Sequence, residues 1–274
     1  MRIFGIDVSE WQGNFDFEAA RAEGVRFAVI RGAYHTYIDS KFEQNYSRAR
    51  RQGLDVGVYQ YTKAVNAQQA AEEAEFLCER VLKGKRFELP IYIDIEDEVQ
   101  RALSREEVTE IIKTWCDYMQ KKNYFAGVYS SLSFFETHTN DEELRAYTHW
   151  VAQWERECSY TPRSVLGMWQ FGGSVNEIRS TQVAGVTCDQ DYMLVDFPEI
   201  IKRTGKNGYT AEEECRGGHY DRPGLVTYTV KRGDTLTEIA DRFGTTVSRI
   251  VDDNKKEYPE ITADFIRAGW HLRV

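Results

Sequence analysis

Cysteine, histidine and long apolar runs are scarce in this 274-residue sequence, and each shortage excludes a class of protein. The 5 cysteines are odd in number and include no Cys-x-x-Cys pair, so neither a zinc site nor a complete disulfide framework is indicated. Cys78 and Cys116 lie in helical patterns, where we expect buried thiols. The 5 histidines show no His-Glu-x-x-His spacing, which argues against zinc. No stretch approaches ~20 consecutive apolar residues, so we expect no contact with a membrane.

A basic surplus is also absent, because the formal net charge is −9 at pH 7. Nucleic acid is therefore not an expected partner, since binding to phosphates needs a basic surface. A Gly-x-Ser-x-Gly nucleophile elbow and a glycine-rich phosphate loop are missing too. The first residues, MRIFGIDVSEWQG, contain no apolar signal-peptide core and begin a strand pattern at once. We therefore expect synthesis in the cytoplasm without a signal peptide.

Strand and helix patterns alternate from residue 1 to about residue 204. Glycine follows three of the predicted helices, and the fourth opens with the capping box Ser-Arg-Glu-Glu. The predicted helices are Phe17–Glu23, Asp39–Gln52, Asn66–Lys83 and Ser104–Lys122. The predicted strands are Ile3–Val8, Arg26–Arg31, Val56–Tyr61, Pro90–Glu96, Ala126–Ser130, Thr148–Trp154, Gly167–Phe171 and Cys188–Leu194.

This order of elements predicts an α/β fold with two domains. Repeated strand–helix units imply a parallel sheet, and eight strands with short connections favour closure into a barrel. Because little helix is predicted after residue 148, we expect a modified TIM-like barrel of about five βα units plus three further strands, in residues 1–203. Residues 204–225 are rich in glycine and polar residues and are predicted to be a linker. Residues 226–274 are predicted to form a compact βααβ unit.

Acidic residues end several of these strands, most clearly in LPIYIDIEDE, residues 89–98. Three isoleucines there alternate with Tyr92, Asp94 and Glu96, so the isoleucines would face the helices and the two acids the barrel interior. Catalytic groups of such barrels lie at the C-terminal ends of the strands. Two carboxylates whose Cα atoms are ~6.6 Å apart raise each other's pKa in a shielded cleft. One can then hold a proton while the other is ionised.

The same position recurs on other strands, since Asp7 ends the first strand and TCDQDYM places Asp189 and Asp191 on the last. We expect Asp7, Asp94, Glu96 and Asp189 to converge on one mouth of the barrel. Carboxylates can also hold Mg²⁺ or Ca²⁺, which is the alternative interpretation, but we predict no metal and no cofactor.

Aromatic residues surround these strand ends and are interleaved with polar residues in VYQYTKA, HWVAQW and MWQFGG. Some are expected to fill the core, but a polar and aromatic groove also suits sugar rings, which have apolar faces and hydroxyl edges. A carboxylate pair in such a groove indicates glycoside hydrolysis. The aromatic residues concerned are Trp11, Tyr34, Tyr59, Tyr61, Tyr129, Trp150, Trp154 and Trp169.

The motifs GIDVSEWQG, IYIDIED, VYSS, WVAQW, MWQF and CDQDYM, in this order, resemble those of glycoside hydrolase family 25 lysozymes, which are N-acetylmuramidases. The resemblance covers residues 3–197 and implies cleavage of the β-1,4 bond from N-acetylmuramic acid to N-acetylglucosamine in peptidoglycan. It implies that Glu96 is the general acid and that Asp94 stabilises the cationic transition state or orients the N-acetyl group. It also implies that Asp7 and Asp189 complete the acidic site and favours retention of configuration.

The sequence departs from the family at Asp191, where the family usually has Asn, so whether Asp189 or Asp191 faces the site stays open. The substrate-binding residues expected beside the acids are Tyr34, Tyr59, Tyr61, Tyr129, Trp150, Gln153, Trp169, Gln170 and Asp191. Two other functions stay open: a non-catalytic peptidoglycan-binding protein, and a chitinase-like glycosidase. The chitinase motif needs a further Asp where this chain has Tyr92.

The C-terminal segment YTVKRGDTLTEIADRFGTTVSRIVDDN resembles a lysin-motif (LysM) domain, which binds glycans that contain N-acetylglucosamine. Its expected glycan-binding residues are Gly233, Asp234, Thr235 and Leu236, and we expect Asp234 to cap the helix that follows. A small domain without a ligand is the alternative. The expected partner is bacterial peptidoglycan, reached after release or lysis as by a phage endolysin or a bacterial autolysin. The sequence gives no indication of whether the protein is a monomer or an oligomer.

Overall fold

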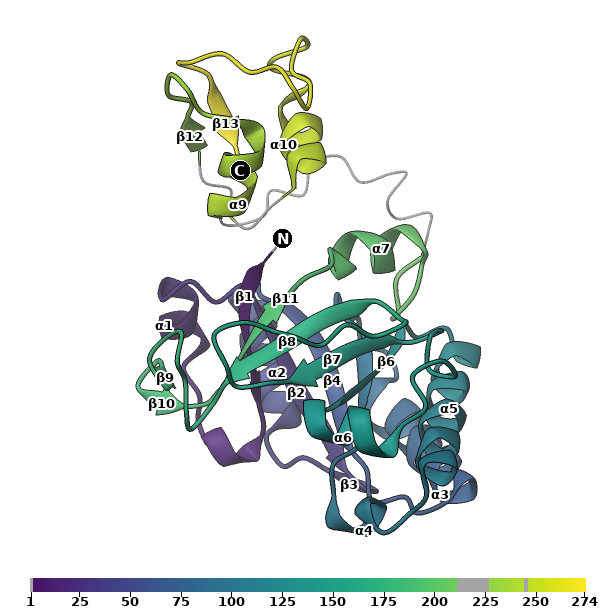
Figure 1. The fold of residues 1–274 in the computed structure, drawn as a ribbon. Coiled ribbons are helices and arrows are strands. Elements are labelled where there is room, and N and C mark those ends of the chain that lie inside the picture. The colour runs from purple at the N-terminus through teal and green to yellow at the C-terminus, as the bar shows by residue number, and fades with distance from the viewer. Residues whose placement is uncertain (1, 211–226, 244–245) are drawn as a thin grey trace. The chain divides into compact units, whose positions relative to one another are not determined.

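The computed structural model of the protein describes residues 2–210, 227–243 and 246–274 (Figure 1). Residues 4–210 fall in one compact unit and residues 227–274 in the other. Most of the predicted linker therefore lies outside the described residues. No helix in the described part of the chain is long and apolar enough to cross a membrane.

The larger unit is built on a closed barrel of eight strands, which confirms the predicted fold class (Figure 1). Seven of the strands run parallel to one another around the barrel, and the eighth, β11, runs antiparallel to β8. β11 lies between β8 and β1, and a pairing of β1 with β2 completes the closure. The barrel strands are β1 (Ile3–Val8), β2 (Phe27–Tyr34), β4 (Asp55–Tyr61), β5 (Ile91–Asp94), β6 (Ala126–Ser131), β7 (Thr148–Ala152), β8 (Leu166–Gly172) and β11 (Asp189–Met193).

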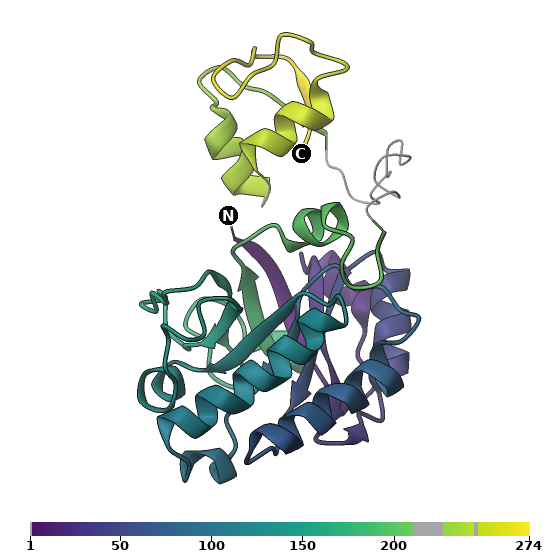
Figure 2. The same ribbon diagram turned by 90° about the vertical axis from the view of Figure 1, so that its right-hand side faces the viewer.

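Helices cover the outside of the barrel, with α3 and α5 packed side by side (Figure 2). The four predicted helices are present, and a short π-helix continues α3. Short helices and strands that were not predicted occupy the connections, where propensity over two to seven residues is a weak signal. The helices are η1 (Glu10–Gln12), α1 (Phe17–Ala22), α2 (Phe42–Arg51), α3 (Ala67–Leu77), η2 (Cys78–Leu82), α4 (Glu98–Arg101), α5 (Arg105–Lys121), α6 (Leu132–His138) and α7 (Phe197–Arg203); the short strands are β3 (Tyr37–Ile38), β9 (Gln182–Val183) and β10 (Val186–Thr187).

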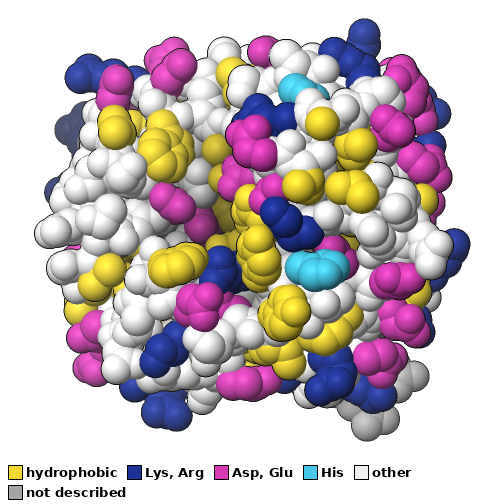
Figure 3. Space-filling view, turned by 90° about the horizontal axis from the view of Figure 1, so that it is seen from below, with side chains coloured by type: hydrophobic (Ala, Val, Ile, Leu, Met, Phe, Trp, Pro, Cys, Tyr) yellow, Lys and Arg dark blue, Asp and Glu magenta, His cyan; other side chains and the backbone are white. Residues whose placement is uncertain are grey.

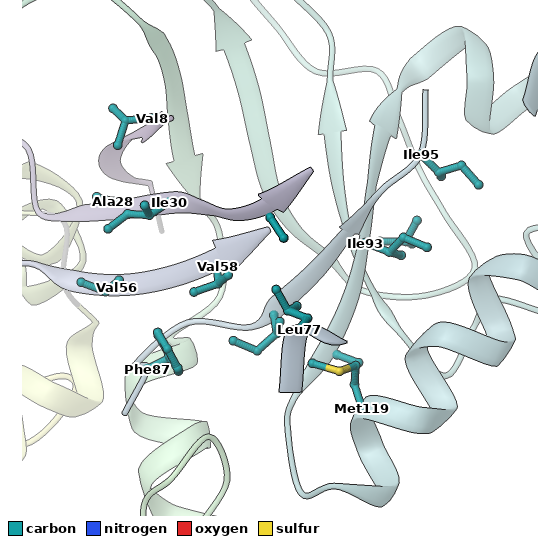
Figure 4. Packing of buried hydrophobic residues seen from close by; sticks show 14 of the residues in the cluster. Val8, Ala28, Ile30, Val56, Val58, Leu77, Phe87, Ile93, Ile95 and Met119 are labelled. Atoms are coloured by element: carbon teal, nitrogen blue, oxygen red, sulfur yellow. The ribbon is translucent and has the colours of Figure 1, made fainter. Parts of the chain in front are cut away.

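The main hydrophobic core lies between the barrel strands and the surrounding helices (Figure 4). Ile91, Ile93 and Ile95 are all fully buried in it. Figure 4 shows Ile93 and Ile95 on the side of β5 that faces the helices, together with Met119 of α5. Cys78 and Cys116 are buried free thiols, as expected. Since side chains alternate along a strand, this packing turns Tyr92 and Asp94 toward the barrel interior.

The larger unit continues beyond residue 203, where the sequence places the start of the linker. Asn207 is fully buried, and its side chain donates to the carbonyl of Leu89 at 2.7 Å and accepts from the amide of Phe125 at 2.7 Å. The amide of Phe87 donates to the carbonyl of Asn207 at 3.1 Å. Glycine-rich composition does not reveal these bonds, because they depend on segments far away in the chain.

The C-terminal unit has the predicted βααβ order: β12 (Thr227–Thr229), α9 (Leu236–Phe243), α10 (Val247–Asn254) and β13 (His271–Arg273). β12 and β13 pair antiparallel. Leu236, Ile239, Ile250 and Leu272 lie in a separate core between the two strands and the two helices. The unit therefore buries its own apolar side chains, as a small domain must.

Candidate active site

Asp94 lies at the end of β5 in an inward-facing row of side chains near the mouth of the barrel. The strand register places it directly between Tyr61 of β4 and Tyr129 of β6, and Tyr129 is opposite Trp150 of β7. Asp94 is only 4% exposed, and its Oδ1 atom has no hydrogen-bond partner within the described chain. A buried carboxylate oxygen without a donor is a position that the N–H group of a ligand can satisfy.

Glu96 follows two residues later, just beyond the strand, where it is only half-buried. Burial, followed by the charge of Asp189, raises the pKa of Glu96. Burial also raises the pKa of Asp94, to which the charge of Glu96 contributes, whereas Arg31 opposes this rise. The expected pair of interacting carboxyl groups is therefore present, the deeper one being Asp94. The raised pKa of both groups makes a shared or unequally held proton possible near neutral pH.

Asp7 and Asp189 reach the same mouth from the other side of the barrel. Asp7 is 6% exposed near the end of β1 and accepts a hydrogen bond from Nε2 of Gln170 at 2.9 Å. Burial, followed by the charges of Asp189 and Asp191, raises the pKa of Asp7. Burial raises the pKa of Asp189 to about 6. Asp189 begins β11 rather than ending it, and it reaches the mouth because that strand runs antiparallel to β8.

Asp191 lies deeper in the barrel than the mouth residues, with no exposed surface. Its Oδ1 atom accepts a hydrogen bond from Nε1 of Trp150 at 2.8 Å, and its carboxyl group also lies within hydrogen-bonding reach of Asp7. Burial raises the pKa of Asp191 well above its usual range, opposed by the bond from Trp150. The half-buried Asp189 is thus the more accessible of the two acids.

Gln170 links the acids to the aromatic wall of the mouth. While its Nε2 atom donates to Asp7, its Oε1 atom accepts from the hydroxyl of Tyr129 at 3.1 Å and from Nε1 of Trp154 at 2.9 Å. Trp154 itself is 37% exposed. These bonds hold Gln170 in one orientation, with its amide directed at Asp7.

The predicted aromatic residues divide between the mouth and the core. Tyr34 and Tyr61 stack with ring centroids 5.2 Å apart, and Tyr34 is 40% exposed. Tyr59 and Tyr129 pack against Trp150 at centroid distances of 6.1 Å and 4.4 Å. On this face, Figure 3 shows a hollow with hydrophobic and acidic side chains gathered around it. The aromatic residues thus form part of one wall with the acids.

Trp169 and Gln153 lie apart from this wall, although they were expected to bind substrate. Trp169 is fully buried on the outer face of β8 and packs against Phe171 and Tyr192, because it alternates with the inward-facing Gln170. Gln153 accepts a hydrogen bond from the amide of Ser159 at 2.9 Å and organises the loop after β7. Both residues support the mouth from behind.

Arg31 is a functional candidate that we did not predict. It lies on β2, is 6% exposed, and donates from Nε to Asp39 at 2.8 Å and from Nη2 to Glu10 at 2.9 Å. Its charge acts on Asp94, so it offsets part of the negative charge at the mouth. A cation inside the otherwise apolar strand FAVIRGAY was the available signal.

Asp97, the last acid of IYIDIED, also has a role that the motif alone does not indicate. Its Oδ2 atom accepts hydrogen bonds from Nζ of Lys63 at 2.8 Å and from the hydroxyl of Tyr61 at 3.0 Å. Its Oδ1 atom accepts from the amide of Val99 and caps α4. Asp97 thus attaches the loop that carries Glu96 to the end of β4.

No three His, Cys, Asp or Glu side chains within the described residues are grouped so that they can hold a metal ion. The buried acids of the mouth have raised pKa values, which is the environment that a proton-transfer site needs. The arrangement can donate a proton from one carboxyl group while another, less accessible carboxylate faces the bound ligand.

In the C-terminal unit, the four predicted glycan-binding residues occupy one turn, but they differ in accessibility. Gly233 has a positive φ of 96°, which favours glycine. Thr235, not Asp234, caps α9, because its hydroxyl accepts from the amide of Glu238 at 3.3 Å. Asp234 instead accepts from Tyr228 and Lys231 and closes the turn. Leu236 is 2% exposed and belongs to the core.

Comparison with known proteins places this barrel among named relatives. An autolytic lysozyme from Clostridium acetobutylicum is 27% identical over 176 residues, which are 64% of this chain and 52% of that protein. Lysozyme M1 from Streptomyces globisporus is 27% identical over 201 residues, which are 69% of this chain and 66% of that protein. The chain therefore spans between about half and two thirds of the length of these two relatives.

Solved structures share the fold. The autolysin LytC from Streptococcus pneumoniae, solved with a synthetic peptidoglycan ligand, has a TM-score of 0.62 at 23% identity, covering 70% of this chain and 46% of that one. A bacterial lysozyme from Streptomyces coelicolor has a TM-score of 0.62 at 22% identity, covering 73% and 96% of the two chains.

Two family models match the two units separately. The model described as LysM domain matches residues 228–274. The model described as glycosyl hydrolases family 25 matches residues 6–178, which is more than half of the chain. With the closed barrel and its acidic mouth, this match shows that the chain belongs to glycosyl hydrolases family 25.

Proposed function

We propose that this chain is a muramidase that hydrolyses the β-1,4 bond from N-acetylmuramic acid to N-acetylglucosamine in bacterial peptidoglycan. The observation that carries the proposal is the pair Asp94 and Glu96, which lie beside Asp189 and the aromatic wall in a family 25 barrel. Glycoside hydrolysis needs one protonated and one ionised carboxyl group on either side of the bond. The four neighbouring acids Asp7, Asp94, Glu96 and Asp189 can supply both the protonated and the ionised carboxyl group.

Glu96 is assigned as the general acid because it is the more accessible member of the pair and can reach the leaving oxygen; its pKa, like that of Asp94, is raised. A carboxyl group that keeps its proton near neutral pH can donate it to the leaving oxygen. Asp94 is assigned to the sugar side. Its unpartnered Oδ1 atom can accept the N–H group of a 2-acetamido substituent and so orient the acetyl oxygen toward the anomeric carbon. The positive charge developing on the sugar favours the ionised form of Asp94.

The two roles can be separated with Glu96→Gln and Asp94→Asn. We expect either substitution to lower kcat on peptidoglycan glycan strands by roughly 10²- to 10⁴-fold. On an aryl β-glycoside whose phenol leaves without protonation, E96Q should recover most of its activity and D94N should not. The exposed neighbour variant Glu98→Gln is the matched control and should keep full activity. Full lysis of walls by E96Q would contradict the proposal.

The bond that is cut can be read from the products. Mass analysis of digested peptidoglycan should find reducing ends on muramic acid, and reducing ends on glucosamine would overturn the assignment. Binding to peptidoglycan without release of any reducing ends would instead favour a non-catalytic protein. A chitinase-like mechanism has little support, because Tyr92 is buried against Trp150 at a centroid distance of 5.1 Å, where that motif needs an acid.

The C-terminal unit is proposed to bind the same glycan and to keep the barrel at the wall, with the turn Gly233–Thr235 in contact with sugar. Either an endolysin or an autolysin would use this division of labour, and an adjacent gene for a membrane-permeabilising protein would favour the endolysin.

A further inference from the structure

The loop after β1 exposes a tryptophan beside the catalytic mouth. Trp11 is 80% exposed, in the short helix η1 that begins three residues after Asp7. Four residues of chain span at most ~14 Å, so the ring is within reach of a polymer bound at the acids. An isolated apolar side chain on a surface needs no explanation. Trp11 differs from such an isolated residue, because the hydrogen bonds around it hold its backbone in place.

Both neighbours of Trp11 are held by hydrogen bonds, Glu10 by residues of other segments and Gln12 by Ser9 of the same loop. Glu10 accepts hydrogen bonds from Arg31 at 2.9 Å and from Ser40 at 2.6 Å, and its amide donates to Asp39 at 3.0 Å. On the other flank, Ser9 and Gln12 form a capping box around η1. The ring is therefore presented to solvent by a backbone that has few alternative conformations.

The same bonds join this loop to the hairpin of β2 and β3, which also exposes apolar side chains at the mouth. Tyr37 is 70% exposed and Ile38 is 42% exposed, beside the stacked pair of Tyr34 and Tyr61. Arg31, buried beneath, binds Glu10 of the loop and Asp39 of the hairpin. Two loops with exposed rings are thus braced into a single platform, here called the rim platform and defined as Trp11, Tyr37 and Ile38.

We propose that the rim platform is a separate glycan-binding subsite, at which Trp11 stacks on a sugar ring of the strand that is being cut. This inference rests on the proposed function, because it assumes a polysaccharide substrate. A sugar has an apolar face that fits a flat ring. A ring that is already fixed loses little conformational entropy when the ligand binds. The occupant is a sugar beyond the two that flank the scissile bond, because the platform begins on the loop outside the acids.

The test uses the full chain with Trp11→Ala on peptide-free glycan strands of two lengths. We expect KM for long strands to rise roughly fivefold, as for the loss of one ring contact, while kcat stays unchanged. A tetrasaccharide, too short to reach the platform, should be cut with unchanged KM and kcat. Trp11→Phe should restore most of the affinity. Val165→Ala is the matched control, since Val165 is 56% exposed beside the start of β8, at the opposite end of the barrel.

Two results would overturn the inference. If KM of W11A for long strands equals that of the unchanged chain, the ring contacts no substrate. If W11A impairs the cleavage of short and long strands equally, Trp11 belongs to the cleavage site itself. A second variant, Tyr37→Ala, should also raise KM only for long strands, and it tests the platform independently of the η1 loop.

Binding without cleavage separates this inference from the proposed function. In the E96Q background, titration with long strands should shift the tryptophan fluorescence to shorter wavelength, and W11A should abolish most of that shift. If the wild-type chain cleaves no glycan, the proposed function fails whatever W11A does. If cleavage occurs but the fluorescence shift is the same with and without Trp11, only the rim platform fails.

Discussion

Gly173 illustrates how a single residue shapes the acidic mouth. A Cβ atom added there would lie 1.9 Å from Oδ1 of Asp189 and 2.8 Å from the ring of Trp154. No such contact is tolerated, so a larger residue must displace the carboxylate, the ring, or both.

We expect Gly173→Ala to lower kcat on glycan strands by roughly tenfold or more, because small misplacements of catalytic groups are costly. The thermal midpoint of unfolding should change little, since the mouth is solvated. Kinetics and thermal denaturation together check this, with the exposed neighbour Ser174→Ala as control. A kcat equal to that of the wild type would mean that Asp189 does not need its present position.

The buried carboxyl group of Asp191 lowers the stability of the folded protein when it is ionised. Its folded-state pKa is raised by burial, whereas an unfolded Asp titrates near about 3.9. The folded state therefore binds this proton more tightly. The resulting stabilisation is complete below about pH 4 and is lost as the pH rises through the raised folded pKa. Asp7 and Asp189 have raised pKa values for the same reason and extend the effect.

We therefore predict that Asp191→Asn stabilises the protein at pH 7.5 by at least about 1 kcal/mol, since each pKa unit corresponds to about 1.4 kcal/mol. At pH 4 the gain should largely vanish. Urea denaturation across this pH range measures the difference, and Asp16→Asn at an exposed helix cap is the control. An equal gain at both pH values would assign the effect to packing rather than to charge.

At the scale of elements, the loop after β5 is positioned by neighbouring strands rather than by its own sequence. Ser130 of β6 donates to the carbonyl of Ile95 at 2.5 Å, and Lys63 after β4 binds Asp97. Glu96 lies between these two attachments. The orientation of Glu96, the proposed general acid, therefore depends on the spacing of three adjacent strands.

We expect Asp97→Asn to reduce kcat about tenfold with KM nearly unchanged, because it removes the ion pair with Lys63. Asparagine is itself a good helix cap, so α4 should persist. Steady-state kinetics and circular dichroism test this expectation. Lys83→Met breaks an exposed pair with Glu79 far from the mouth and should leave both kinetic constants unchanged. If D97N left both kinetic constants unchanged, as K83M should, the hydrogen bond from Ser130 would be enough to hold the loop.

At the scale of the whole molecule, the two units have separate hydrophobic cores and separate proposed tasks. Shortening the chain to residues 1–210 should leave kcat/KM on soluble tetrasaccharides unchanged. Lysis of insoluble walls at low enzyme concentration should fall roughly tenfold or more, because tethering raises the local concentration of the barrel. Parallel assays on the two substrates check this, and equal losses on both would show that the C-terminal unit supports the barrel itself.

A second truncated chain, which ends at residue 203 rather than at residue 210, provides a matched control. Ending the chain at residue 203 removes Asn207, whose side chain satisfies buried groups of Leu89 and Phe125. Each bond contributes roughly 1 kcal/mol, and an unsatisfied buried group costs more. The chain ending at 203 should therefore melt several degrees below the one ending at 210.

Local sequence determined much of this molecule. Alternation along IYIDIED predicted which side of β5 faces the helices, and local patterns predicted four of the helices, because both signals depend on neighbouring residues alone. The positions of Asp7, Asp94 and Glu96 at strand ends followed in the same way. These features survive in the structure because burial of one face of each element enforces them.

Only the tertiary structure decided the rest. The reversed direction of β11, the buried brace of Arg31 with Glu10 and Asp39, and the close approach of Gly173 to Asp189 each join residues that are distant in the chain. Trp169 is buried on the outer face of the barrel because Gln170, its neighbour on β8, is the residue that faces inward. No local pattern encodes such contacts, because they exist only once the barrel has closed and its strands have taken their register.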